Sequence, residues 1–237
     1  MKIKSIKILT LLLAVLILWS CKSKSGSPEE EENFSKDASY ALGMSIGSSF
    51  KEGLKSDNII PNYDEFFKGF KDGLFDKKKR FDSTEAMTII EEAFNAITEK
   101  QNAEAEKKEI AFLAENSKKP GVKITSSGLQ YEIINETNKK KPSITDTVRV
   151  HYEGKLADGN VFDSSYQYGE PVDLPLEAVI PGWSEGIQLM GLGSKYILYI
   201  PSNMGYGPSG MTNPYTGTVI VPPFATLIFT VELLEIL

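Results

Sequence analysis

The hydrophobic positions divide the chain into three zones. An unbroken apolar run extends from Ile8 to Trp19. Between Asp37 and about Asn116, apolar residues recur every three or four positions, which is typical of helices that bury one face. After Gly121, short apolar runs are separated by clusters of turn-forming residues, which is typical of strands. The pattern therefore predicts a helical N-terminal part followed by a part that is rich in β-structure.

The first two predicted helices are short. One begins near Asp37 and contains Gly43 and Gly47, small residues that allow a neighbouring helix to approach closely. The other begins near Asn62, directly after Pro61. Its apolar positions are spaced by three and four residues and are Phe66, Phe67, Phe70 and Leu74.

A third predicted helix is much longer. Residues 82–85 form a variant of the capping box that starts helices, and the helical pattern continues to about Asn116. Such a helix would be roughly 50 Å long. Its residues 99–109 are polar on every side, which is typical of helices that connect domains. We therefore expect a long helix that links a helical module to the C-terminal part. The apolar residues of its first half are Ile90, Phe94 and Ile97.

The helical zone, residues 37–120, is too short to enclose a large core. Small helical modules bury little apolar surface by themselves, so contact with a second copy would supply the missing core. We therefore expect this zone to form a homodimer. The alternative is a monomeric helical spacer.

The C-terminal zone, residues 121–237, predicts an α+β domain. A short helix is expected between Leu176 and Met190, with Pro181 near its start and Ile187 facing inward. Several strands around one short helix give a half-barrel. The four predicted strands are Leu129–Ile134, Val148–Leu156, Tyr196–Ile200 and Leu227–Leu234.

Residues 1–20 have the basic start and the short apolar run of a secretory signal peptide. The segment Leu18–Cys21 resembles a bacterial lipoprotein cleavage box, in which the cysteine is lipidated. The alternative is cleavage near Ser25, which would release a soluble protein. We favour lipidation of Cys21 and expect the chain to lie outside the cytoplasm, anchored to a bacterial membrane. Residues 21–36 are small, polar and charged, and we expect them to form a flexible tether.

The composition excludes several classes of function. The net charge of −6 argues against nucleic acid as a partner, because phosphate binding needs a basic surface. One histidine and one cysteine cannot form a Cys/His metal site, and a single cysteine cannot form a disulfide within the chain. We therefore expect no metal and no cofactor. Any catalysis must use shape, hydrogen bonds, desolvation or carboxylates.

Four phrases near the C-terminus place single aromatic residues among glycines and strand-like runs. They are V-H-Y-E-G-K-L-A-D-G-N-V-F-D-S-S, A-V-I-P-G-W-S-E-G, G-Y-G-P and P-P-F-A-T-L-I-F-T-V-E-L-L. In this order they resemble the FKBP-type peptidyl-prolyl cis/trans isomerases, from about Thr125 to Leu237. The resemblance implies an antiparallel half-barrel that rotates X-Pro peptide bonds. The helical zone more loosely resembles the N-terminal domain of macrophage-infectivity-potentiator-type members, whose helices form a dimer.

The resemblance also implies a set of site residues. Trp183 would be the floor on which the proline ring lies. The main-chain amide of Ile180 would bind a ligand carbonyl, and the hydroxyl of Tyr206 would contact the substrate carbonyl. The other residues that the resemblance places in the catalytic pocket are Tyr152, Phe162, Asp163, Val179 and Phe229.

One carboxylate lies beside the expected pocket. We expect Asp163 to accept a hydrogen bond from the hydroxyl of Tyr152 rather than to act as a general acid. His151 should lie on the opposite face of its strand, because side chains alternate along a strand, and we expect no catalytic role for it. No arginine occurs in residues 166–170, where some members pair one with the pocket aspartate. The expected substrate-binding rim consists of Val172, Leu174, Ile220 and Val221.

Two functions fit these residues. The first is a prolyl isomerase that accelerates the folding of proteins outside the cytoplasm by binding X-Pro segments. For this function the resemblance implies macrolides as inhibitors. The second is a non-catalytic chaperone or surface adhesin that binds Pro-containing segments. We favour the enzyme, because a pure binding protein does not need Trp183, Tyr206 and Asp163 together.

Overall fold

The structure is a computed structural model that describes residues 34–56, 59–75 and 77–237. Contacts between Cα atoms divide the chain into two compact units, one that ends at Asp82 and one that comprises Ser83–Leu237. By its contacts the long third helix therefore belongs to the second unit. The domain boundary expected between residues 120 and 121 stays a prediction.

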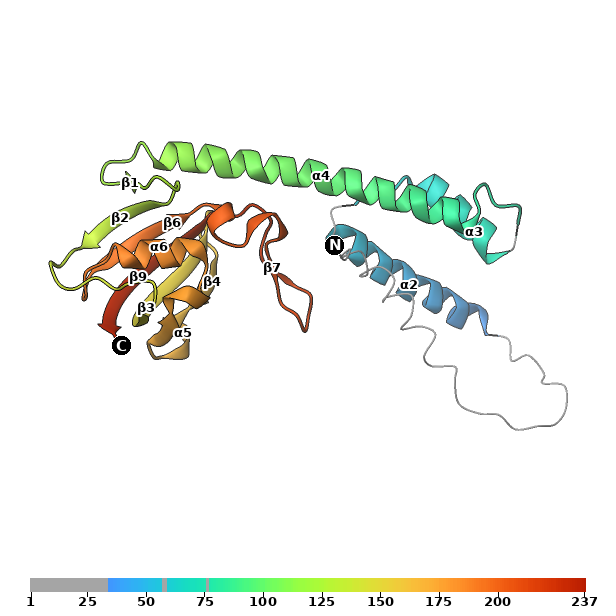
Figure 1. Ribbon diagram of the computed structural model, residues 1–237. Helices are drawn as coiled ribbons and strands as arrows, with labels where there is room; N and C mark the ends of the chain where they lie inside the picture. Colours follow the sequence, from blue (N-terminus) through green and yellow to red (C-terminus); the bar gives the residue numbers. More distant parts are fainter. Residues whose placement is uncertain (1–33, 57–58, 76) are drawn as a thin grey trace. The chain divides into compact units, whose positions relative to one another are not determined.

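The first unit contains two helices, α2 (Lys36–Ser56) and α3 (Tyr63–Leu74) (Figure 1). The side-chain oxygen of Asn62 accepts a hydrogen bond from the backbone N–H of Glu65 at 3.2 Å. Helix α3 thus begins next to the predicted start, and the Asn62 side chain caps it by satisfying one of the free N–H groups of the first turn.

Apolar side chains of the first unit remain largely exposed. The ring of Phe50 stacks on that of Phe66, with centroids 4.7 Å apart. None of the described side chains of α2 and α3 is buried. The described part of this unit therefore has no closed core. The large apolar side chains that are more than half exposed include Tyr40, Leu42, Met44, Phe67, Phe70 and Leu74.

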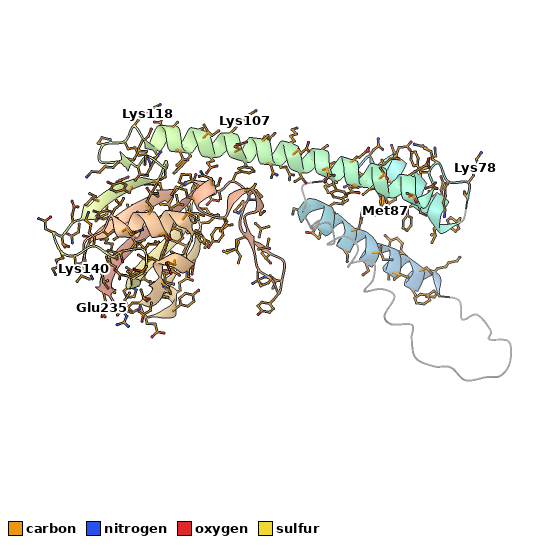
Figure 2. The ribbon with its side chains drawn as sticks, in the orientation of Figure 1. Lys78, Met87, Lys107, Lys118, Lys140 and Glu235 are labelled. Atoms are coloured by element: carbon orange, nitrogen blue, oxygen red, sulfur yellow. The ribbon has the colours of Figure 1, made fainter. Side chains whose placement is uncertain are left out.

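Helix α4 (Ser83–Asn116) opens the second unit and agrees with the predicted long helix. Its middle is exposed, and Figure 2 shows Lys107 directed away from the sheet. Its last turns differ, because Phe112 is half-buried and Asn116 is buried. The ring of Phe112 lies 6.4 Å from that of Tyr199 on the sheet. The C-terminal end of α4 is thus packed against the sheet.

The second unit is built on one antiparallel sheet. The strands follow the order β1-β2-β6-β9-β3-β4, and β5 pairs with β3 outside this path. The long strands β3 and β9 are neighbours, and Tyr152 lies opposite Val231 in their register. The strands are β1 (Lys123–Ile124), β2 (Gln130–Asn135), β3 (Thr147–Leu156), β4 (Val161–Ser164), β5 (Val172–Pro175), β6 (Lys195–Ile200) and β9 (Leu227–Ile236).

Short elements connect these strands. A separate hairpin lies between β6 and β9 in the chain and consists of β7 (Met211–Thr212) and β8 (Val219–Val221). The helical elements are α5 (Ser165–Tyr168), η2 (Leu176–Ala178), α6 (Pro181–Gln188), η3 (Ser202–Met204) and η4 (Gly207–Ser209).

Helix α6 is the predicted short helix, and it lies against the sheet (Figure 1). A Cβ atom on Gly182 would lie 2.3 Å from Cγ2 of Ile200 in β6, so only glycine lets the helix approach this closely. Ile187 is fully buried, as the sequence predicted, and Met190 just after the helix is fully buried as well. Helix and sheet therefore enclose one core.

The side chains of β3 show which face of the strand packs into the core. Val150 and Tyr152 are buried, while His151 between them is only partly buried. His151 thus lies on the opposite face of the strand, as predicted from the alternation. The fully buried apolar core includes Leu129, Val148, Val150, Leu176, Ile187, Leu198, Ile200, Leu227, Val231 and Leu233.

The α+β class and the half-barrel are confirmed. The four predicted strands are present as β2, β3, β6 and β9, with ends that differ from the prediction by at most two residues. The four predicted strands did not include β1, β4, β5 or the hairpin of β7 and β8.

Among the described helices we find none with the length and apolar character that a membrane span requires. The apolar run from Ile8 to Trp19, the expected lipidation site Cys21 and the expected tether up to residue 33 lie outside the described residues.

Candidate active site

Trp183 lies in the first turn of α6 and forms the base of a cluster of rings. The ring of Tyr152 from β3 and that of Phe229 from β9 each stand edge-on to the indole, with centroids 5.0 Å away. Edge-to-face pairs of this kind contribute about 0.5–1.5 kcal/mol each beyond the area that they bury. The indole is 4% exposed, so the three rings form a tight base rather than an open cup.

Phe162 of β4 extends the cluster toward solvent. Its ring is half-buried and lies 5.4 Å from Phe229 in an edge-to-face arrangement. Gly154 of β3 stands opposite Phe229, and a Cβ atom there would lie 2.5 Å from Cε1 of that ring. The two phenylalanines can therefore meet only because residue 154 has no side chain.

The carboxylate of Asp163 lies beside this cluster and accepts two phenol hydrogen bonds. The hydroxyl of Tyr152 donates to Oδ2 at 2.7 Å, as the sequence predicted, and the hydroxyl of Tyr168 donates to Oδ1 at 3.2 Å. Burial raises the pKa of Tyr152, and the hydrogen bond and charge of Asp163 raise it further. The phenol thus stays a donor at neutral pH, and the carboxylate is engaged as an acceptor.

Tyr206, Val179 and Ile180 border the ring cluster. All three are partly buried and pack against the buried core that contains Trp183. Burial raises the pKa of Tyr206, and the negative charge of Asp163 adds to this effect. Ile180 directly precedes α6, and its carbonyl accepts the backbone N–H of Trp183 at 2.9 Å. The segment 179–180 is thus tied to the residue that forms the base.

The expected rim residues do not all lie at a rim. Val172 and Leu174 on β5 and Ile220 on β8 are partly buried and pack against the core. Val221 is 1% exposed, so its side chain belongs to the core. Among the expected pocket and rim residues, Tyr152, Trp183 and Phe229 are thus buried in the ring cluster. Val221 is buried in the core, and the remaining expected residues are partly buried.

An open hollow of about 680 Å³ adjoins the cluster on the side of Tyr152. It extends from the ring cluster along β5 and the preceding loop. Its lining residues are Arg149, Tyr152, Tyr168, Glu170, Pro171, Val172 and Asp173.

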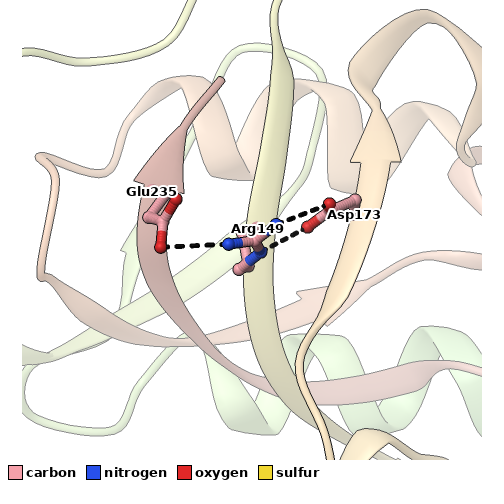
Figure 3. Close-up of polar contacts among 3 residues, drawn as sticks. All are labelled: Arg149, Asp173 and Glu235. Atoms are coloured by element: carbon pink, nitrogen blue, oxygen red, sulfur yellow. Dashed lines mark hydrogen bonds and ion pairs between the residues drawn. The ribbon is translucent and has the colours of Figure 1, made fainter.

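Arg149 connects three strands at this hollow (Figure 3). Its Nε and Nη2 donate to the two carboxylate oxygens of Asp173 on β5 at 2.6 and 2.8 Å. Its Nη1 donates to Glu235 on β9 at 3.1 Å. The hydrogen bond from Arg149 lowers the pKa of Asp173. The guanidinium thus ties the edge strand β5 to the centre of the sheet.

His151 is occupied by contacts away from the ring cluster. Its ring stacks on Tyr166, with centroids 4.6 Å apart, and its Nδ1 lies 2.9 Å from Oγ of Ser165. That hydroxyl also accepts the backbone N–H of Tyr152 at 2.8 Å. The histidine therefore supports the turn after β4.

Tyr168 is the residue at this site that the sequence reasoning missed. Residues 166–170 contain no arginine, yet the phenol of Tyr168 provides a donor to Asp163 from that same segment. The sequence indicates this contact only by a tyrosine five positions after Asp163, in a segment without regular periodicity.

Two family models match the chain. One, described as FKBP-type peptidyl-prolyl cis-trans isomerase, matches residues 138–234, which contain the ring cluster and Asp163. The other, described as the domain amino terminal to FKBP-type peptidyl-prolyl isomerase, matches residues 35–133. The chain belongs to the FKBP-type peptidyl-prolyl cis-trans isomerases.

Individual relatives match most of the chain. It is 39% identical to the FKBP-type isomerase FkpA of Aeromonas hydrophila, over 87% of this chain and 78% of that protein. It is 41% identical to the FKBP-type 22 kDa isomerase of Escherichia coli, with 84% and 94% covered. It is 35% identical to the outer membrane protein MIP of Legionella longbeachae, with 84% of each covered.

A solved structure is similar as well. The crystal structure of FkpA from Escherichia coli aligns with a TM-score of 0.70 at 33% identity. The alignment covers 86% of this chain and 97% of that one.

Proposed function

We propose that the ring cluster around Trp183 is where this isomerase rotates X-Pro peptide bonds. Rotation must cross a barrier of roughly 18–20 kcal/mol, because twisting destroys amide resonance. Without a catalyst this takes tens of seconds or longer at room temperature. The planar amide is more polar than the twisted one, so an apolar surface that removes water favours the twisted state. The observation that carries the proposal is the set of edge-to-face rings with a hydrogen-bonded carboxylate at its edge.

The chain's own residues have distinct roles in this proposal. Trp183 supports the proline ring, and Tyr152, Phe162 and Phe229 form walls around it. Because the indole is only 4% exposed, side chains that cover it must move as the proline enters. The amide of Ile180 and the hydroxyl of Tyr206 bind carbonyls of the peptide.

Asp163 orients a wall of the site in this proposal and transfers no proton. It accepts the hydroxyl of Tyr152 at 2.7 Å, which fixes the ring that stands edge-on to Trp183. In the same proposal, the residues of the peptide that flank the proline contact four apolar side chains, which are those of Val172, Leu174, Val179 and Ile220.

The proposal is tested by a protease-coupled assay with a short peptide that contains an apolar residue followed by proline. The wild-type rate should exceed the buffer blank, and an added macrolide should reduce it. Trp183→Leu and Phe162→Ala should each lower kcat/KM by about tenfold or more, since each removes aromatic surface of about 1–3 kcal/mol. His151→Ala should stay near the wild-type value, because its ring contacts Tyr166.

The outcome separates the two candidate functions. A wild-type rate equal to the blank would reject the isomerase and leave a module that binds Pro-containing segments. Circular dichroism of each variant checks that it is folded. Phe162→Ala is the more decisive variant. Its half-buried ring contributes less to the core than Trp183 does, so a loss of activity is less easily explained by a loss of folding.

We also infer where the protein works and with what partners. The signal-like residues 1–20, followed by Cys21, support lipid anchoring outside the cytoplasm. A relative that carries the name outer membrane protein MIP supports a location in the bacterial envelope. The exposed apolar side chains of α2 and α3 support a homodimer through the N-terminal helices. The clients would be Pro-containing segments of proteins that fold outside the cytoplasm.

A further inference from the structure

The last turns of α4 contact the loop that leads to Tyr206. Both oxygens of the Glu109 carboxylate accept hydrogen bonds from Ser202. Oε1 accepts the backbone N–H, and Oε2 accepts the hydroxyl at 2.8 Å. Both residues lie within the compact unit Ser83–Leu237. Ser202 is 5% exposed, so water cannot easily replace the carboxylate.

Independent contacts fix the helix from which Glu109 reaches this loop. The ring of Phe112 packs near Tyr199, and the side chain of Gln130 donates to the carbonyl of Leu113 at 2.9 Å. The amide of Asn116 donates to the same Gln130 at 3.0 Å. The carboxylate of Glu109 is therefore presented by a helix end that β2 and β6 hold in place.

The hydrogen bonds of the loop carry this restraint from Ser202 to Tyr206. Ser202 is the first residue of η3, and its carbonyl accepts the backbone N–H of Gly205 at 3.0 Å. Tyr206 follows directly, and Gly207 after it accepts the backbone N–H of Phe224 at 3.1 Å. The position of Ser202 therefore sets where the chain enters the turn that carries the Tyr206 hydroxyl.

We propose that Glu109 is a positioning residue of the isomerase site, which holds the loop 201–206 so that Tyr206 lies at the edge of the ring cluster. The inference rests on the proposed role of Tyr206 in binding a substrate carbonyl. It also makes the last turns of α4 a part of the site. A charged carboxylate suits this task, because it accepts two donors at once and forms stronger hydrogen bonds than a neutral group.

Glu109→Gln in the full chain is the first test. The amide keeps the size of the side chain but presents a donor where Ser202 also donates. In the peptide assay kcat/KM should fall by about five- to tenfold, because a buried donor loses its acceptor. Ser202→Ala should have a smaller effect of the same sign, and Ser202→Thr, which keeps both donors, should retain the wild-type rate. Glu104→Gln, an exposed glutamate on the same helix, is the matched control.

A double-mutant cycle with Tyr206→Phe shows whether Glu109 acts through the phenol. If it does, Glu109→Gln should change kcat/KM by less than about twofold in the Tyr206→Phe background, since the hydroxyl to be positioned is already absent. Equal losses in both backgrounds, or a wild-type rate for Glu109→Gln, would overturn the proposal. If Glu109→Gln does not fold, Ser202→Ala decides the matter by the same criteria.

Hydrogen exchange separates this inference from the proposed function. The amides of Ser202 and Gly205 should exchange faster in Glu109→Gln than in the wild type and in Glu104→Gln, whether or not the protein is active. Unchanged exchange at both amides would show that Glu109 does not hold the loop. If the wild type is inactive but exchange is faster in Glu109→Gln, the isomerase site is rejected. The inference that Glu109 holds the loop 201–206 still stands in that case.

Discussion

At the residue scale, the orientation of the Tyr152 ring depends on one carboxylate with two phenol partners. Asp163 accepts the hydroxyls of Tyr152 and Tyr168, and its charge raises the pKa of Tyr168. The Tyr168 hydroxyl therefore stays a donor across the neutral range. Unlike Tyr152, it is bound at the outer side of the carboxylate, where its side chain is exposed.

We predict that Tyr168→Phe lowers kcat/KM for short peptides by about twofold, because one hydrogen bond that holds Asp163 is lost while the stronger one remains. The melting temperature should hardly change, since Tyr168 is exposed. Tyr166→Phe, on the same short helix, is the control and should keep the wild-type rate. Identical rates for the two variants in the protease-coupled assay would contradict a role for Tyr168.

The site residues differ in how far the sequence could reveal them. The pairing of Tyr152 with Asp163 was predicted, because both belong to a phrase whose order and spacing match the family. Glu109 could not be found in this way, since its partner Ser202 is distant in the chain and the surrounding residues 99–109 are polar throughout. Val221 was misplaced at the rim because a strand residue next to a loop gives no sign of which side it buries.

At the scale of single elements, β5 is a short edge strand beside the site. It has four residues and pairs only with β3. The bidentate contact from Arg149 to Asp173 adds a side-chain link to this pairing (Figure 3). Because Val172 of β5 lines the hollow beside Tyr152, this link also holds one wall of the hollow.

We predict that Asp173→Asn lowers the melting temperature slightly at pH 7. The pKa of Asp173 is lowered in the folded state, so its contribution is present above its ordinary value of 3.8 and is lost as the pH falls through the lower folded value. The difference between the variant and the wild type should therefore shrink below pH 3.8. The effect is small, because both partners are partly exposed.

Thermal unfolding at a series of pH values measures this difference. Glu177→Gln, which replaces an exposed carboxylate close by in the chain, should show no such pH-dependent difference. A gap between Asp173→Asn and wild type that persists unchanged at pH 2 would contradict the ion pair as its cause.

The elements that the sequence predicted are those long enough to show a period. The long helix α4 and the strands β3 and β9 contain several repeats of their apolar pattern, and their ends were placed to within two residues. Strand β4 has four residues and β7 has two, so neither can display an alternation. Their extended form depends on pairing with β3 and β8, respectively, which is a tertiary effect.

At the scale of the whole molecule, the first unit leaves its apolar side chains uncovered. Tyr40, Phe67 and Phe70 are each more than half exposed. Exposed apolar surface costs about 25 cal/mol per Å², so association of two copies would be favourable. This supports the homodimer that the sequence suggested.

We predict that a protein of residues 22–237 is a dimer, whereas residues 122–237 alone are monomeric. Multi-angle light scattering gives the mass of each. A monomer mass for the longer protein at micromolar concentration would reject the dimer. Phe67→Ser combined with Phe70→Ser should weaken the association without lowering the activity on short peptides, because these residues lie in the first unit.

The anchor is a separate prediction. Mass spectrometry of the mature protein from bacterial membranes should show Cys21 as a lipidated N-terminal residue. Cys21→Ser should move the protein from the membrane fraction to the soluble one, since acyl chains would provide its attachment. An unmodified Cys21 in the mature protein would exclude the anchor.

The contact between Gly182 and Ile200 limits how this site can change. Even a methyl group on residue 182 would push α6 away from β6 and carry Trp183 with it. The base of the pocket is therefore rigidly coupled to the sheet, and a substitution there alters stability and activity together. New substrate preferences can arise more freely in the loop between β7 and β8, where Pro214, Tyr215 and Thr216 are exposed and make no part of the core.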